Sequence, residues 1–394
     1  MINSNLSSKI STFMNSLPYN GYKQPTEPFK PKMSEAHDPQ TSPVSGVSNS
    51  QSSSIPEERE KKIQDAVADC PKKDQHNKMK FISEFSVEDL KSAMESQSID
   101  SHDKASVSEY DELLKELLNF IKILGKLTAI IVTTKERNKD HLGTGFLQRI
   151  QIKNNSDGSQ TAVLTLTTAY HVFGVKETIK EEEKYKLAQD WKSMNVRARF
   201  FYDKPGDIGD EKKCLKLQNF RLLETDMEID VDNDWCAIEC EVKDTKLLPR
   251  VIDLKRYLQT YQEMQKTLFE MSKRTEYQKI NLVVIVGHPH GQPKMVSIGR
   301  HYVTSNAIAK EVRSGQRWCR YYYDAPTCEA SSGSPVFIFG QSITGFGYWF
   351  GHAHNHKKNV NEDNPVWKEV MEMNKNLKYL SQSTIGVEHI DSRN

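Results

Sequence analysis

The sequence predicts a β-rich core to which helices are added on the N-terminal side and between two groups of strands. Three observations support this. Short apolar runs of strand character recur at 162–172, 280–286 and 336–339. Apolar residues at helical spacing fill 110–124. The first 78 residues, in contrast, contain few apolar clusters. At 394 residues the chain exceeds one average domain, yet a β-rich unit of about 200–250 residues is common.

The N-terminal third divides into two parts. Residues 1–78 are rich in Ser, Asn, Pro, Lys and Gln, a composition that favours a disordered tail. Residues 79–125 are expected to form a helical extension. A capping-box-like start at Ser86 opens a short helix, and a longer helix follows Ser108 and ends at Gly125. The apolar stripe of the second helix predicts packing on the core, with a docking or self-association surface as the alternative.

Residues 126–394 are expected to form the main domain. Strand patterns at 195–202 and 317–323 add to those named above. Two charged insertions interrupt the strands, and both read as helices: an exposed one at 177–192 and a longer one at 247–278. These insertions are either surface decoration or places where a regulator binds.

A serine lies in a Gly-containing turn directly before one of the apolar strands. Ser332 belongs to the segment 330–335, and the strand begins at Val336. Such a turn can expose a hydroxyl and aim backbone N–H groups at the same point. Acyl transfer needs both, because the attacking oxygen must be accessible and the developing oxyanion must meet fixed donors. Ser332 is therefore a candidate nucleophile.

Two further residues fit the roles of base and orienting acid. His171 follows a β-rich segment, so it would be held rigidly. Asp234 stands where a polar turn enters another apolar strand, and its carboxylate could orient the imidazole. Asp232 is the alternative acid, since it lies in the same turn. The chain order His, Asp, Ser differs from that of α/β-hydrolases.

These segments resemble those of chymotrypsin-fold (trypsin-like) serine peptidases, in the branch that needs no zymogen cleavage. The resemblance covers roughly 125–350. It rests on five motifs in order: Gly143-Thr144-Gly145-Phe146, Thr168-Ala169-Tyr170-His171, Asp234-Trp235-Cys236-Ala237-Ile238, Gly287-His288-Pro289-His290-Gly291 and Ala330-Ser331-Ser332-Gly333-Ser334-Pro335.

The resemblance implies two six-stranded antiparallel β-barrels, with N-terminal and inserted helices around them. It further implies a serine endopeptidase with the triad His171, Asp234 and Ser332. The backbone amides of Ala330 and Ser332 would form the oxyanion hole. The expected partner is a protein or peptide substrate, and no cofactor is implied.

Two departures from the family pattern leave a second function open. Ser331 stands where secreted relatives carry an aspartate that pairs with a freed N-terminus, so that activation route is not available. Ala330 replaces a glycine in the oxyanion loop, and alanine resists positive φ. The alternative function is a catalytically weak or inactive barrel that binds proteins or peptides.

Substrate pocket and metal sites are less well marked. By position, the pocket would draw on Asp324, Pro326, Thr327 and Tyr348. The alternating histidines of 352–356 suggest a metal at first sight, but nothing obvious completes four ligands, and a solvated turn is expected. His288 and His290 are expected to be structural or groove residues. The sequence thus predicts no metal site.

Charge and cysteine content indicate which partners and which cellular location to expect. A net charge of +1 gives no general attraction to nucleic acid or anionic membranes, and no apolar run approaches the length of a membrane span. The start of the chain lacks the apolar core of a signal peptide. Six cysteines show no pattern of local disulfide pairs. A cytoplasmic location is therefore expected, with a nuclear one left open.

Overall fold

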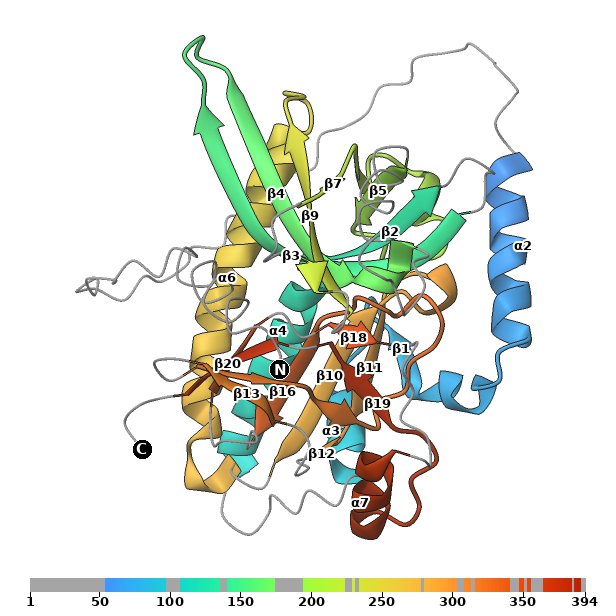
Figure 1. The fold of residues 1–394 in the computed structure, drawn as a ribbon, viewed down its shortest axis with the longest axis vertical. Helices are drawn as coiled ribbons and strands as arrows, with labels where there is room; N and C mark the ends of the chain where they lie inside the picture. The colour runs from blue at the N-terminus through green and yellow to red at the C-terminus, as the bar shows by residue number, and fades with distance from the viewer. Residues whose placement is uncertain are drawn as a thin grey trace, which may run out of the picture.

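A computed structural model of the chain gives the fold (Figure 1). The structure describes residues 54–96, 107–134, 140–173, 194–223, 229–230, 234–277, 280–302, 308–312, 316–340, 347–350, 353–355, 364–384 and 386–390.

The largest sheet contains eight antiparallel strands in the order β6-β5-β2-β3-β4-β9-β7, with β8 also paired to β9. Its strands are β2 (Thr128–Thr134), β3 (Asp140–Asn154), β4 (Gln160–Ala169), β5 (Asn195–Phe200), β6 (Leu215–Gln218), β7 (Arg221–Leu222), β8 (Ile229–Asp230) and β9 (Trp235–Val242). Every residue of β4 after its first is buried, which explains its continuous run of apolar residues and threonines.

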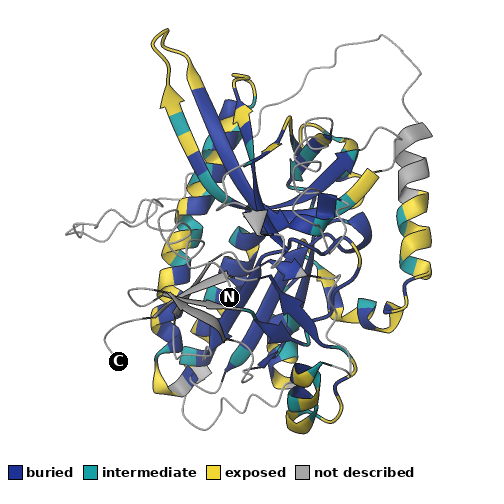
Figure 2. Cartoon of the chain, viewed as in Figure 1, coloured by how far each residue is buried: buried dark blue, intermediate teal, exposed yellow. Residues whose placement is uncertain are grey.

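Three four-stranded sheets make up most of the rest, in the orders β1-β11-β10-β16, β12-β15-β19-β18 and β13-β14-β20-β17. Their strands are β1 (Met79–Phe81), β10 (Asn281–Gly287), β11 (Met295–Gly299), β12 (His301–Tyr302), β13 (Ile308–Val312), β14 (Gln316–Cys319), β15 (Tyr322–Tyr323), β16 (Val336–Gly340), β17 (Gly347–Phe350), β18 (His354–Asn355), β19 (Ser381–Ser383) and β20 (Gly386–Ile390). In Figure 2 the central strands are almost wholly buried, whereas the tip of the β3–β4 hairpin is exposed.

The prediction of a β-rich core with added helices is confirmed. The described strands fall into one sheet of eight and three sheets of four, so two six-stranded barrels are not confirmed as such. The strand expected over 317–323 is split between β14 and β15, which lie in different sheets.

Five α-helices surround the described strands: α2 (Ser54–Ala68), α3 (Val87–Ser96), α4 (Val107–Leu127), α6 (Leu248–Ser272) and α7 (Pro365–Met373). The helix predicted within 247–278 is α6, which runs alongside both the eight-stranded sheet and the strands below it (Figure 1). Leu254 packs in the core of the large sheet and Leu268 in the core around β10 and β16. The insertion thus joins the two cores and is more than surface decoration. The helix expected over 177–192 lies outside the described residues.

The apolar stripe of α4 faces the interior. Leu113, Leu117, Ile121 and Leu124 are fully buried in the core that includes β10 and β16. This confirms packing on the core and removes the stripe as a docking surface. Gly125 was expected to end the helix, and that prediction was wrong, because α4 continues to Leu127. A side chain at Gly125 would collide with Ile82, so close packing accounts for this glycine.

The N-terminal boundary also needs correction. Residues 54–78 were expected to belong to a disordered tail, but they form α2 and the 3₁₀ turn η1 (Lys73–Lys78). Cys70, Lys72 and Gln75 are buried there although the local composition is polar. Tertiary contacts with the turn 289–291 and the segment around Cys328 order a stretch that could not form a core alone. Residues 1–53 lie outside the described part.

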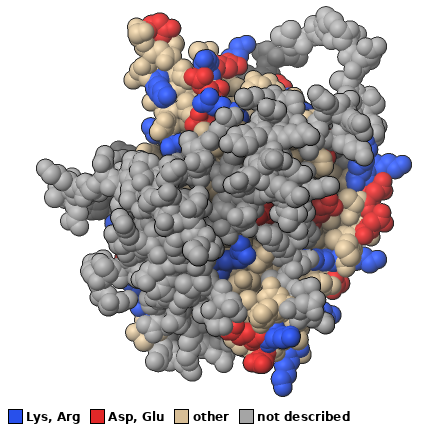
Figure 3. Space-filling view, viewed as in Figure 1, with Lys and Arg blue, Asp and Glu red and all other residues tan. Residues whose placement is uncertain are grey.

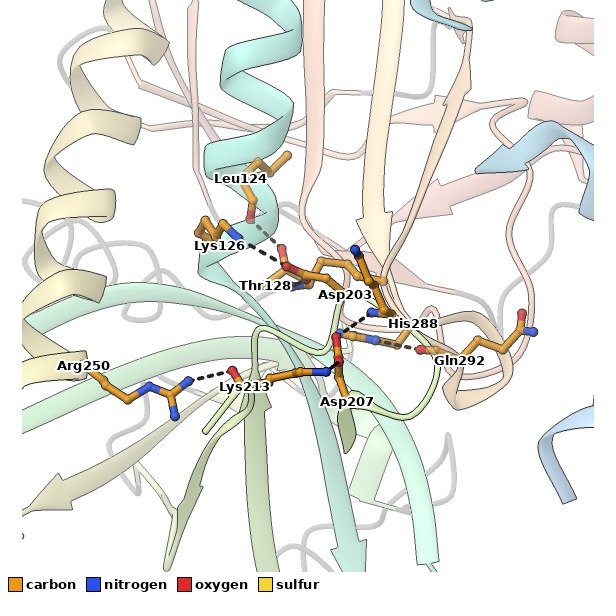
Figure 4. Close-up of polar contacts among 11 residues, drawn as sticks. Leu124, Lys126, Thr128, Asp203, Asp207, Lys213, Arg250, His288 and Gln292 are labelled. Carbon is orange, nitrogen blue, oxygen red and sulfur yellow. Dashed lines mark hydrogen bonds and ion pairs between the residues drawn. The ribbon is translucent and has the colours of Figure 1, made fainter. Parts of the chain in front are cut away.

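A charged cluster links the large sheet to the strands around β10 (Figure 4). Asp203 follows β5, and its carboxylate lies 2.9 Å from Lys294 Nζ and 3.3 Å from Lys126 Nζ. Lys294 is fully buried. Burial lowers the pKa of Lys294, although Asp203 counteracts the effect. This pairing holds the end of α4, the large sheet and the segment before β11 together.

One face of the molecule shows no strong bias of charge where it is described (Figure 3). Lys and Arg side chains are mixed with Asp and Glu over the described part of the face in Figure 3. Among the helices that the structure describes, none is both long and apolar enough to cross a membrane.

Candidate active site

The pairing of β4 with β9 brings His171 to Asp234. These strands are antiparallel, and Ala169 at the end of β4 lies opposite Trp235 at the start of β9. The residue that precedes β9 must therefore lie beside the residues that follow β4. The Tyr170 N–H donates to the Asp234 carbonyl at 3.0 Å, and the His171 N–H donates to Asp234 Oδ1 at 2.9 Å.

The side chains of the three predicted triad residues form a continuous chain of contacts. His171 Nδ1 lies 2.6 Å from Asp234 Oδ2, and His171 Nε2 lies 2.7 Å from Ser332 Oγ. A carboxylate can only accept, so Nδ1 carries the proton in this contact and Nε2 is left to accept the serine proton. Asp232, the alternative acid, lies outside the described residues.

Burial at the site increases away from the imidazole. The His171 side chain is 15% exposed, that of Asp234 9%, and Ser332 as a residue 4%. A carboxylate that is largely removed from water interacts strongly with a neighbouring imidazole, because less solvent screens the pair. The imidazole edge is therefore the most accessible part of the arrangement.

The serine is held by the loop between β15 and β16 rather than by a strand. Thr144, in the first half of β3, supplies two of the anchors. Its N–H donates to the Ser332 carbonyl at 2.8 Å, and its hydroxyl donates to the Ala330 carbonyl at 3.0 Å. The same hydroxyl accepts the His288 N–H at 3.1 Å. The loop is thus attached to the large sheet, where His171 and Asp234 lie.

Two further contacts fix the far side of the loop. The Gly333 N–H donates to the His354 carbonyl at 2.9 Å, and the His354 N–H donates to the Ser334 carbonyl at 2.8 Å. Gly333 has φ of 89°, and a Cβ there would collide with the Thr144 carbonyl and the Thr168 hydroxyl. Only glycine fits this close approach.

The backbone at two candidate site residues is in the left-handed region. Ala330 has φ of 66° and Asp234 has φ of 60°. Aspartate tolerates this region better than alanine, for which it costs roughly 1–2 kcal/mol. Alanine was expected to resist positive φ, and Ala330 nevertheless adopts it. Such strain tends to persist at functional positions.

Ser331 takes part in the internal bonding of the loop. Its hydroxyl accepts the Cys328 N–H at 3.3 Å, and its own N–H donates to the Cys328 carbonyl at 3.0 Å. Ser331 is buried. A neutral hydroxyl here needs no counter-charge.

The residues proposed for a substrate pocket have other contacts. Asp324 accepts the Arg300 N–H at 2.6 Å and the Tyr302 hydroxyl at 2.7 Å. The Pro326 carbonyl accepts the Ser297 hydroxyl at 2.5 Å. Thr327 is buried and lies 3.3 Å from the Ser381 hydroxyl. The side chain of Tyr348 lies outside the described residues. The roles of these residues in substrate binding stay predictions.

Most of the described histidines other than His171 are interior. His354 was expected in a solvated turn, but it is fully buried, and its Nδ1 lies 2.7 Å from the Tyr323 hydroxyl. That prediction was wrong because His354 belongs to β18, which braces the serine loop. His352 and His356 lie outside the described residues. Burial lowers the pKa of His288 to about 3, and its ring stacks on Tyr202, so His288 is structural as expected.

Sequence reasoning missed the anchors of the serine loop. Thr144 was noted only as part of a hairpin motif, and nothing in the local pattern indicates that its hydroxyl bonds to a segment 186 residues away. The contact of Thr168 Oγ1 with the Thr144 carbonyl, at 2.6 Å, has no local signal either. The one available hint was the glycine on each side of Thr144, which predicts a close backbone approach.

Comparisons with known proteins give limited information. No protein-family model matches the chain, and no curated protein matches it in sequence. Among solved structures, the chain is similar to an HtrA-type protease AlgW with tripeptide, at 11% identity and a TM-score of 0.30, over 58% of this chain and 52% of that one. A serine-to-alanine variant of AlgW with tripeptide gives 9% identity and a TM-score of 0.31, over 69% and 58%. The chain therefore spans little more than half of these structures, and at such scores the likeness carries no argument about fold or activity.

Proposed function

We propose that this protein is a serine endopeptidase in which Ser332 is the nucleophile, His171 the general base and Asp234 the residue that orients His171. The observation that supports it best is the continuous contact chain of 2.6 Å and 2.7 Å through the imidazole. A single contact of this kind is common in proteins. A buried carboxylate, an imidazole and a serine in line, on segments from different sheets, form the arrangement that activates a hydroxyl.

The proposed reaction proceeds in two acyl-transfer steps. His171 Nε2 takes the Ser332 proton as Oγ attacks the scissile carbonyl, and the resulting imidazolium is stabilised by Asp234. The imidazolium then donates this proton to the leaving amine. Water repeats the sequence on the acyl-enzyme and releases the second product. No cofactor takes part in these steps.

The oxyanion hole is proposed to consist of the backbone N–H groups of Ala330 and Ser332. The positive φ of Ala330 and the anchoring of its carbonyl by Thr144 fix the orientation of this segment before substrate binds. Fixed donors lower the barrier because they need no reorganisation when the oxyanion forms. We further propose that the strands form a double β-barrel of the chymotrypsin type, and that the protein acts in the cytoplasm on protein or peptide substrates, a nuclear location being left open.

Labelling with a fluorophosphonate probe tests this function. The wild type should be labelled at Ser332, as located by mass spectrometry of its peptides. Ser332→Ala and His171→Ala should not be labelled. The matched control is Ser159→Ala, which removes an exposed hydroxyl between β3 and β4, outside the serine loop, and should keep its labelling. An unlabelled but folded wild type would overturn the proposal and favour a protein- or peptide-binding module.

A further inference from the structure

Four side chains that the proposed mechanism does not use converge behind the serine loop. Cys70 and His76 come from the segment after α2, His290 from the turn η6 (Pro289–Gly291), and Cys328 from the loop that leads to Ser332. Each offers one sulfur or nitrogen atom, and the four atoms all lie within 4.8 Å of one another. Among the described residues this is the group of His, Cys, Asp and Glu side chains arranged closely enough to hold a metal ion.

Three of the six distances within the group lie close to the edges of a tetrahedral zinc site. With Zn–S of about 2.3 Å and Zn–N of about 2.0–2.1 Å, ideal edges are about 3.8 Å between sulfurs, about 3.6 Å between sulfur and nitrogen, and about 3.4 Å between nitrogens. The two sulfurs, of Cys70 and Cys328, are 3.7 Å apart. His76 Nε2 lies 3.2 Å from Cys328 Sγ and 3.3 Å from His290 Nε2.

The surroundings of the group favour a metal site over a chance cluster of exposed side chains. Cys70, His290 and Cys328 are buried, and His76 is half-buried. His290 has φ of 55°, a strained conformation for a residue other than glycine, and the turn directs its ring to His76 at a centroid distance of 5.1 Å. The Lys72 N–H also donates to Cys70 Sγ at 3.4 Å, the kind of outer contact that supports a metal-bound thiolate.

The types of ligand atom indicate which metal ion the site would bind. Two thiolates and two neutral imidazoles are the ligands of closed, structural zinc sites, and two thiolates balance the charge of Zn²⁺. Because Zn²⁺ with two thiolates carries no net charge, burying the bound site costs less than burying two thiolates without the metal. Four protein ligands leave no open position, so such a site would hold structure and would not activate water.

We propose that Cys70, His76, His290 and Cys328 form a structural zinc site that fastens the N-terminal segment to the loop carrying Ser332. Two hydrogen bonds join Cys328 and Ser331: the Cys328 N–H donates to the Ser331 hydroxyl, and the Ser331 N–H donates to the Cys328 carbonyl. The His290 N–H donates to the Glu329 carbonyl at 2.6 Å. The metal would therefore fix the loop at Cys328, in addition to its attachment to Thr144. The zinc site does not depend on Ser332 being catalytic.

The sequence predicted no metal site, and His290 was assigned a structural or groove role. The reason is the spacing of the ligands. Cys70 and Cys328 are 258 residues apart, and the closely spaced cysteines of the chain, Cys236 and Cys240, lie on β9 outside this group. The only local pair is Cys70 with His76, in a segment expected to be disordered.

The metal content of the full chain tests the proposal. The wild type is purified without chelator and analysed by elemental mass spectrometry, and it should contain one zinc per chain. His76→Ala changes the most exposed ligand and should bind zinc at least about 100-fold more weakly in competition with a chromophoric chelator. Cys214→Ser is the matched control, because Cys214 is a buried free thiol outside the group, and it should keep its zinc.

Two measurements on the wild type keep the test independent of variant folding. Removal of zinc by a chelator should lower the melting temperature, and addition of Co²⁺ should give the visible bands of tetrahedral coordination by thiolates. A wild type that neither contains zinc nor takes it up would overturn the proposal, as would zinc retained by His76→Ala at wild-type affinity. A disulfide between Cys70 and Cys328, found by peptide mapping of freshly isolated protein, would also overturn it. Phosphonate labelling of Ser332 reports separately on the proposed enzyme, so failure of one proposal is distinguishable from failure of the other.

Discussion

The two halves of the candidate active site are built in different ways. His171 and Asp234 lie at the adjoining ends of neighbouring strands, β4 and β9, so one strand pairing places both. Ser332 lies in a loop whose position depends on separate contacts with β3 and β18, together with the proposed zinc. The first half is a consequence of sheet register. The second is assembled from segments that are far apart in the sequence.

This difference indicates which changes should affect which property. Changes in the His171–Asp234 half should act on chemistry and leave the fold intact, because backbone pairing maintains that geometry. Changes in the charged cluster of Asp203, Lys294 and Lys126, which lies outside both halves, should affect stability first. Changes at the serine loop should affect the placement of the nucleophile, with smaller effects on stability.

The largest effect is expected for Asp234→Asn. Asparagine also tolerates positive φ, so the turn should keep its shape. An amide, however, can hold the imidazole in the wrong tautomer, and the rate of phosphonate labelling should fall by about 10⁴-fold. The melting temperature should change little. A labelling rate within about tenfold of the wild type would show that Asp234 does not orient His171.

The next effect concerns the charged cluster that joins the large sheet to the segment before β11. Asp203→Asn leaves the fully buried Lys294 without its carboxylate partner. Loss of one partner of a buried pair costs about 3–5 kcal/mol, which urea unfolding at pH 7 should detect. Glu241→Gln is the control, because the exposed contact of Glu241 with Lys243 should contribute less than about 1 kcal/mol. Equal costs for the two variants would contradict this account of the cluster.

The same cluster predicts a pH dependence. Burial raises the pKa of Asp203, but Lys294 and Lys126 outweigh burial and hold it below the usual value. The folded protein therefore keeps this carboxylate ionised at a pH where the unfolded chain binds the proton. The stabilisation is complete above about pH 4 and is lost as the pH falls through the folded-state pKa. The difference in unfolding free energy between wild type and Asp203→Asn should shrink over that range, as urea titrations between about pH 5 and 2 would show.

The contrast between the strand-paired half and the loop half also explains how much of the site could be predicted from the sequence. Strand patterns and the adjacent polar residues pointed to His171 and Asp234, because the information lies within a few residues of each strand end. Ser332 was found from its Gly-containing turn. Its anchors Thr144 and His354 were not found, since each acts through contacts with segments distant in sequence. The order in residues 54–78 was missed for the same reason, as a polar segment gains its stability from tertiary contacts.

A moderate effect is expected for Thr144→Val. Valine keeps the branched shape of threonine but loses the hydrogen bonds to the Ala330 carbonyl and from the His288 N–H. Buried groups left unpaired cost about 1–3 kcal/mol, and the labelling rate should fall as the loop loosens. The matched control is Thr133→Val, because the buried hydroxyl of Thr133 has no hydrogen-bond partner within the described structure. Equal losses of stability and of labelling rate in Thr144→Val and Thr133→Val would contradict the role given to the Thr144 hydroxyl.

The smallest effect is expected for Ala330→Gly. Glycine removes the cost of positive φ, roughly 1–2 kcal/mol, but loses about 0.5–1 kcal/mol through the greater entropy of the unfolded chain. A net gain of about 0–1.5 kcal/mol should result, with labelling unchanged within about threefold. Ala325→Gly, at a buried position without positive φ, should be destabilising instead. A loss of stability in Ala330→Gly would show that the left-handed conformation is not under strain.

The central claim is that the two halves together hydrolyse peptide bonds at Ser332. The most direct test is incubation of wild type and Ser332→Ala, purified in parallel, with a library of peptides derived from a whole proteome, so that sequence preference cannot conceal activity. Mass spectrometry then identifies new peptide termini. We expect new termini with the wild type and none above background with Ser332→Ala. The same termini with both proteins, or none with a wild type that is folded and loaded with zinc, would contradict the claim.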